Sequence, residues 1–114
     1  MGETNPDKFG IAFRGSGSYL PKQILTNKDI SSVVDTSDAW IKTRTGISKR
    51  RISNMTESVS QMGYEAALGA LEMADWSSET IDLILLATST PNDLFGSAPQ
   101  IQSKLGAKNA VAFD

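Results

Sequence analysis

Residues 83–113 read LILLATSTPNDLFGSAPQIQSKLGAKNAVAF, and this stretch decides the fold class. Its first five residues, 83–87, form a continuous apolar run, which is typical of a strand buried on both faces of a parallel sheet. Residues 97–105 then predict a helix that ends at Gly106. A second apolar run over 110–113 predicts another buried strand. The order strand, helix, strand indicates an α/β fold.

The segment before this unit holds the clearest helical pattern. Apolar and small side chains recur there at the period of one helix face, at Val59, Met62, Ala66, Ala67, Ala70, Leu71 and Ala74. Because this helix is rich in Ala and Gly, we expect it to pack very close to its neighbour. Asn54 and Glu57, three residues apart, predict a capping box just before it.

The N-terminal part begins with a polar stretch. Residues 1–8 predict a flexible tail, and 9–114 predict one folded domain portion. Within it, 9–13 is a short apolar run that predicts a strand. Gly15 and Gly17 follow, and we interpret them as a turn at the end of this strand rather than as a phosphate-binding loop.

Two short helices are predicted next. Thr26 or Asn27 can cap the first, which we expect to run through Val33, because both side chains can accept from free backbone N–H groups. Ser37 can cap the second over residues 38–45. Strands alternating with helices again favour an α/β architecture.

Composition excludes several classes of protein. The 114 residues hold 11 Lys and Arg against 13 Asp and Glu, a net charge of −2, whereas a general nucleic-acid binder is strongly basic. The chain has no Cys and no His, so these residues contain no zinc finger, disulfide, cysteine nucleophile or imidazole base, and we predict no metal site. The sequence shows neither a signal-peptide pattern nor an apolar stretch long enough for a bilayer. We therefore expect a cytoplasmic protein without a membrane or nucleic-acid partner.

Charge is unevenly distributed. Residues 42–51 hold five of the 11 basic residues and no acidic one, a pattern that can attract an anionic ligand. Trp40 and Arg44 lie four apart, on one face of the predicted helix, and Thr36 lies near its start. An indole, a guanidinium and a hydroxyl together can stack a base and bind phosphates. The alternative is that Trp40 anchors a core and the basic run is a solvated edge.

Other polar and aromatic residues give weaker signals. Asp35, Asp38 and Asp93 have the chemistry of acid–base groups, but without a partner His we predict turn and cap roles for them. We predict no catalytic residue in this chain. Phe95, in the predicted loop 88–96, either fills a core or contacts a ligand or partner.

Several of these segments together resemble a known family. The stretch DTSDAWIKTRTGI at 35–47, followed by RRI at 50–52, resembles the N-terminal signature of the β-ketoacyl-acyl carrier protein synthase III family. The resemblance continues over residues 9–114, through GSGSYLP at 15–21, LTN at 25–27, LATSTP at 86–91 and LGAKNA at 105–110.

The resemblance implies a thiolase-like fold, with two similar α/β halves that each hold a five-stranded mixed sheet covered by helices, assembled as a homodimer. This chain would be an incomplete part of the N-terminal half. The family condenses an acyl-CoA primer, usually acetyl-CoA, with malonyl-acyl carrier protein to initiate fatty-acid synthesis, with coenzyme A thioester as substrate and no separate cofactor. Its reactive Cys, His and Asn would lie beyond Asp114, so the segment alone is expected to be inactive.

The resemblance also implies roles for single residues. Trp40 resembles the tryptophan that stacks on the adenine of coenzyme A, Thr36 and Arg44 resemble nearby contacts, and Thr45 would line the same entrance. Phe95 resembles the loop phenylalanine that closes the acyl pocket of the dimer partner.

Two alternatives stay open. One is a non-catalytic module that binds coenzyme A or another phosphorylated ligand. The other is a related condensing enzyme with a different acyl donor, because substrate choice in the family depends largely on residues outside this segment. Gly96 and Pro99 depart from the family's pattern beside the acyl-pocket loop, so the resemblance does not define the primer preference.

Overall fold

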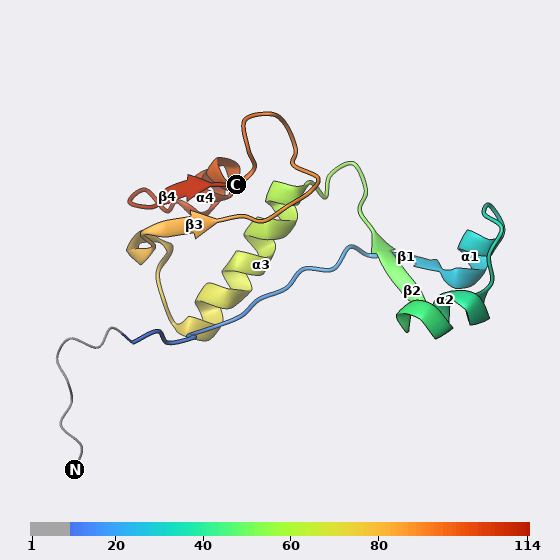
Figure 1. Cartoon of the computed structure of the whole chain (residues 1–114). Coiled ribbons are helices and arrows are strands. Elements are labelled where there is room, and N and C mark those ends of the chain that lie inside the picture. The colour runs from blue at the N-terminus through green and yellow to red at the C-terminus, as the bar shows by residue number, and fades with distance from the viewer. Residues whose placement is uncertain (1–9) are drawn as a thin grey trace, which may run out of the picture.

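The computed structural model describes residues 10–114, so the predicted tail at 1–8 lies outside the described residues. The helices and strands form two groups joined by extended connections (Figure 1). The Cα radius of gyration is 19.2 Å, against about 13 Å for a compact chain of this length. The two groups therefore do not close around one core. Among residues 10–114, no helix has the length and apolar character needed to cross a membrane.

The first group holds two strands and two helices: β1 (Gln23–Thr26), α1 (Asn27–Ser31), α2 (Asp38–Thr45) and β2 (Lys49–Ile52). β1 and β2 pair antiparallel, with Gln23 opposite Ile52 and Thr26 opposite Lys49. Neither strand was predicted. The residues of β2 are mostly basic and show no apolar alternation.

Local capping explains where the two helices of this group begin. Thr26 accepts from the backbone N–H of Asp29, whose carboxylate accepts from that of Thr26, so Thr26 rather than Asn27 caps α1. α1 ends at Ser31, before the predicted Val33. Ser37 accepts from the N–H of Trp40 and caps α2, whose predicted bounds are confirmed.

The second group contains α3 (Val59–Ala74), a 3₁₀ turn (Ser78–Thr80), β3 (Leu83–Leu85), α4 (Ala98–Leu105) and β4 (Val111–Phe113). β3 and β4 pair parallel, with Leu83 opposite Val111 and Leu85 opposite Phe113. The predicted parallel pairing and the helix between the strands are confirmed. The α/β fold class is likewise confirmed.

The predicted capping box before α3 is wrong in one half. The Glu57 carboxylate does accept from the Asn54 N–H, at 2.9 Å. The Asn54 side chain, however, accepts from the backbone N–H of Thr56, and the two residues close a turn. Ser58 caps the helix instead, by accepting from the N–H of Gln61, because α3 begins one residue after it.

The strand predicted over 9–13 is absent from the described residues 10–13. A strand needs a hydrogen-bonded neighbour, and this segment instead leads into an extended connection that runs along α3 (Figure 1). Gly17 approaches the backbone of α3 so closely that a Cβ on this residue would lie 1.9 Å from the carbonyl oxygen of Ala66. The expected close packing of α3 is confirmed here, and again at Gly63, which faces Ile101 of α4.

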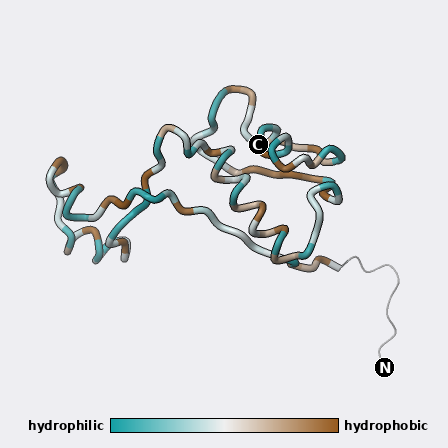
Figure 2. Tube along the Cα trace, turned by 180° about the vertical axis from the view of Figure 1, so that it is seen from behind, coloured by the Kyte–Doolittle hydropathy of each residue, from teal (hydrophilic) through white to brown (hydrophobic). Residues whose placement is uncertain are grey.

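β3 and β4 are not buried on both faces, contrary to prediction. Figure 2 shows β3 as a hydrophobic stretch of the chain. Side chains on one face of the pair remain about half or more exposed: Leu83, Leu85, Val111 and Phe113, at 51%, 64%, 62% and 51%. Within residues 10–114 nothing covers this face, which forms an apolar patch.

We expect this apolar patch to make the chain self-associate. Light scattering after size exclusion should give a mass above that of a monomer, because an exposed apolar face favours association. Leu85→Lys, which places a charge on the patch, should shift the protein toward the monomer. Val33→Lys, at a residue that is 82% exposed and belongs to the first group, is the control and should leave the mass unchanged. A monomeric wild-type chain at all concentrations would contradict the prediction.

Candidate functional site

A hollow of about 610 Å³ lies between α1, the connection after it and α2. Its lining is formed by Ile30, Val34, Asp35, Thr36, Ser37, Trp40 and Ile41. The volume is in the range of small-molecule sites, and an apolar lining with a few polar groups is typical of them.

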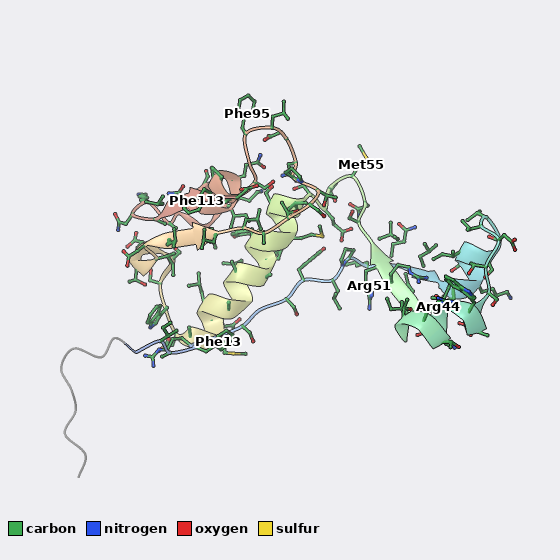
Figure 3. The ribbon with its side chains drawn as sticks, in the orientation of Figure 1. Phe13, Arg44, Arg51, Met55, Phe95 and Phe113 are labelled. Atoms are coloured by element: carbon green, nitrogen blue, oxygen red, sulfur yellow. The ribbon has the colours of Figure 1, made fainter. Side chains whose placement is uncertain are left out.

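Trp40 lines this hollow, and Arg44 lies over its indole ring. One turn of α2 separates them, and the Arg44 guanidinium carbon lies 5.0 Å from the centre of the indole ring. Figure 3 shows Arg44 at α2, in the first group. Trp40 is 55% exposed, so it is not the core anchor of the alternative interpretation. The cation steadies the ring, while the exposed indole surface remains available for stacking.

Thr36 adds a polar group to the same hollow. Its hydroxyl oxygen is buried and has no hydrogen-bond partner among the described residues. Buried polar atoms are normally paired, because leaving one unpaired costs free energy. A ligand atom entering the hollow beside Trp40 would supply the missing partner.

Thr45 is separated from this arrangement. Its hydroxyl donates to the Ile41 carbonyl at 2.8 Å and accepts from the Ile47 N–H at 3.1 Å, and it is not part of the lining. The structure thus places Thr36 and Trp40 in the lining and Arg44 over the Trp40 ring, while Thr45 lies outside the lining. A role at a coenzyme A entrance stays a prediction for all four residues.

Two other cations of the 42–51 window have partners away from Trp40. Lys42 pairs with Asp38, Nζ to Oδ2 at 2.8 Å, and this bond, helped by an amide donor from Asn27, lowers the pKa of the Asp38 carboxyl. Arg51 donates to the Pro21 carbonyl at 2.9 Å. The basic window is therefore spread over α2 and β2, and within it Arg44 lies over the Trp40 ring.

Phe95 lies at the tip of the loop between β3 and α4 (Figure 3). It is 89% exposed and Leu94 is fully exposed, which excludes a core role for Phe95 in this structure. Asn92 braces the loop by accepting from the Val59 N–H at 2.9 Å and donating to the Ser60 hydroxyl at 2.7 Å. Asp93 accepts from the Phe95 N–H, in the predicted turn role.

Asp114 closes the other end of this loop. Its carboxylate accepts from the N–H groups of Ser97 and Ala98, at 2.8 and 2.7 Å, and so satisfies the start of α4. The Ser97 side chain makes no cap bond, so the predicted cap is at the right position but uses another residue. No local sequence signal identifies Asp114 as the cap of α4, because it is remote in sequence from the start of that helix.

Trp76 forms a second pair of the same kind in the other group. The Arg14 guanidinium carbon lies 5.7 Å from its ring centre, and the side chain is 48% exposed. No basic residue lies near Trp76 in the sequence, and Arg14 is brought to it only by the course of the chain along α3. Neither Arg14 nor Trp76 lines the hollow beside α2.

Comparisons with known proteins add a family context. No protein-family model matches the chain. The chain is 73% identical over 110 residues, 96% of its length, to β-ketoacyl-[acyl-carrier-protein] synthase III from Prochlorococcus marinus subsp. pastoris, of which it covers 33%. It thus spans about a third of the length of the curated relatives it matches.

Solved structures give the same picture. The 3-oxoacyl-[acyl-carrier-protein] synthase III from Aquifex aeolicus is 50% identical with a TM-score of 0.84, over 89% of this chain and 33% of that one. The priming β-ketosynthase of the R1128 polyketide pathway is 36% identical with a TM-score of 0.76, over 90% of this chain and 31% of that one.

Proposed function

The chain is a relative of β-ketoacyl-[acyl-carrier-protein] synthase III over about a third of that enzyme's length, and on this premise we propose that it forms the coenzyme A entrance of a thiolase-like condensing enzyme. The whole enzyme would join an acyl-CoA primer, such as acetyl-CoA, to malonyl-acyl carrier protein at the start of fatty-acid synthesis. It would act as a homodimer in the cytoplasm.

The observation that carries this proposal is the half-exposed indole of Trp40, held under Arg44 at the hollow. The nucleotide end of coenzyme A combines a flat base with phosphates. Stacking on Trp40 suits the base, and the Arg44 guanidinium supplies a donor fork and a positive charge for a phosphate. The unpaired hydroxyl of Thr36 supplies a further hydrogen bond.

Phe95 supports the homodimer part of the proposal. An almost fully exposed phenylalanine on a braced loop is a feature of a recognition surface, because the loop loses little entropy on binding. We propose that it enters the acyl pocket of a second copy. This role would make Phe95 a determinant of primer size.

A ligand series tests the coenzyme A entrance. Titration calorimetry should show that adenosine 3′,5′-bisphosphate keeps most of the affinity of coenzyme A, whereas pantetheine, which lacks the base, binds far more weakly. The proposal fails if pantetheine binds as well as coenzyme A, or if neither the coenzyme nor the bisphosphate binds.

Catalysis is expected to need more than these residues. The chain contains no Cys and no His, so it cannot supply the thiol and the imidazole that the proposed condensation uses. We predict no turnover of acetyl-CoA with malonyl-acyl carrier protein by the 114 residues alone. A chimera in which residues 10–114 replace the matching third of the Aquifex aeolicus relative should be active.

The chimera also separates the alternatives. Turnover by the isolated chain would contradict the prediction, and an inactive, folded chimera that still binds coenzyme A would favour a non-catalytic module. The second candidate is a related condensing enzyme with a different acyl donor, and the likeness to a priming β-ketosynthase of a polyketide pathway supports a member outside fatty-acid synthesis. A series of acyl-CoA primers of increasing length distinguishes that candidate by its preference for primers other than acetyl-CoA.

A further inference from the structure

Asn27 is a buried polar side chain that the proposed function does not use. It is the first residue of α1 and is 1% exposed. Thr26 performs the capping that sequence reasoning had assigned to either residue. The buried amide of Asn27 must therefore be explained by other contacts.

Those contacts join Asn27 to both ends of α2. Its Nδ2 donates to the Asp38 carboxylate at 2.9 Å and to the Ile47 carbonyl at 2.8 Å. Asp38 opens α2, and Ile47 directly follows Gly46, the left-handed residue that ends it. A third bond, from the Asn27 backbone N–H to the Ser48 carbonyl at 3.1 Å, continues toward β2.

These bonds fix the two walls of the hollow relative to each other. α1 contributes Ile30 to the lining, and α2 contributes Trp40 and Ile41. At 3.6 residues per turn, Asp38 and Trp40 project from different sides of α2. Asn27 is not part of the lining, so it acts on the hollow through the position of the helix.

We propose that Asn27 is a positioning residue for ligand binding, which sets the placement of α2 and with it Trp40 and Arg44. The inference rests on the proposed function of the hollow. The Asn27 amide offers two N–H donors, one to a carboxylate and one to a carbonyl, without bringing a charge into a buried position. A carboxylate in its place would face the Asp38 carboxylate and the Ile47 carbonyl, with repulsion in place of both bonds.

The test uses the full chain with Trp76→Phe, because Trp40 is then its only tryptophan. Asn27→Ala should weaken coenzyme A binding by about tenfold, and Asn27→Asp should weaken it by more than tenfold. Trp40 fluorescence follows the binding. Without ligand, both variants should change the quenching of Trp40 by acrylamide while far-UV circular dichroism stays unchanged. Lys28→Ala, at an exposed neighbour on α1, is the control and should change neither.

Folded Asn27 variants with unchanged affinity and unchanged quenching would overturn the proposal. If they do not fold, Asp38→Ala and Asp38→Asn decide. Both remove the charge that pairs with Lys42, but the asparagine still offers an acceptor to Asn27 and should restore most of the affinity lost in the alanine variant. Equal affinities would overturn the proposal. A wild-type chain that does not bind coenzyme A refutes the proposed function, whereas the quenching experiment still tests Asn27 separately.

Discussion

Trp40→Ala is expected to lower the affinity for coenzyme A by about ten- to hundredfold. Stacking of a base on an aromatic side chain contributes about 1–3 kcal/mol, and each 1.4 kcal/mol is about tenfold in affinity. The substitution also removes the ring beneath Arg44, 5.0 Å from its guanidinium carbon, so the cation loses its fixed position. Titration calorimetry with coenzyme A measures the change directly.

Trp76→Ala is a matched control for this result. Both tryptophans are about half exposed, at 48% for Trp76 and 55% for Trp40, and each has an arginine over its ring. The two substitutions therefore remove the same kind of side chain, but only Trp40 lines the hollow. Coenzyme A affinity should be unchanged in Trp76→Ala. Equal losses in the two variants would mean that Trp40 acts through general stability rather than through the site.

The sequence predicted best what short-range chemistry controls. The bounds of α2 follow from a capping Ser37 and a terminating Gly46, which act on the nearest backbone groups. The parallel pair β3–β4 follows from two apolar runs around a helix. Trp40 and Arg44 meet because the helix period brings them together.

Contacts between residues that are remote in sequence could not be predicted from local patterns. The strand predicted from residue 9 lacks a neighbouring strand in the part of the chain that the structure describes. β2 was missed because its basic residues carry no apolar pattern, and pairing with β1 decides its conformation. Asn27 and Asp114 act on groups that are remote in sequence, so their residue types alone could not reveal these bonds.

Among the glycines that the structure describes, Gly17 leaves the least room for a Cβ, and its substitution has the largest expected effect on folding. In Gly17→Ala, the new Cβ would lie 1.9 Å from the carbonyl oxygen of Ala66 and 2.5 Å from the amide nitrogen of Ala70. These atoms belong to the backbone of α3 and cannot turn aside, so the segment must leave the helix. We expect a loss of about 3 kcal/mol or more in the free energy of unfolding. Urea unfolding in the Leu85→Lys background, followed by circular dichroism, measures it.

Two other glycines show why backbone contact is decisive. At Gly10 a Cβ would meet nothing within 4 Å, so Gly10→Ala should change stability by less than about 0.5 kcal/mol. At Gly63 the Cβ would lie 2.6 Å from Cδ1 of Ile101, the end of a flexible side chain. Ile101→Val removes this atom and should therefore restore most of the stability lost in Gly63→Ala. Gly17→Ala has no such remedy, because Ala66→Gly leaves the opposing carbonyl in place. Similar losses of unfolding free energy in Gly10→Ala and Gly17→Ala would show that the segment around Gly17 does not lie against α3.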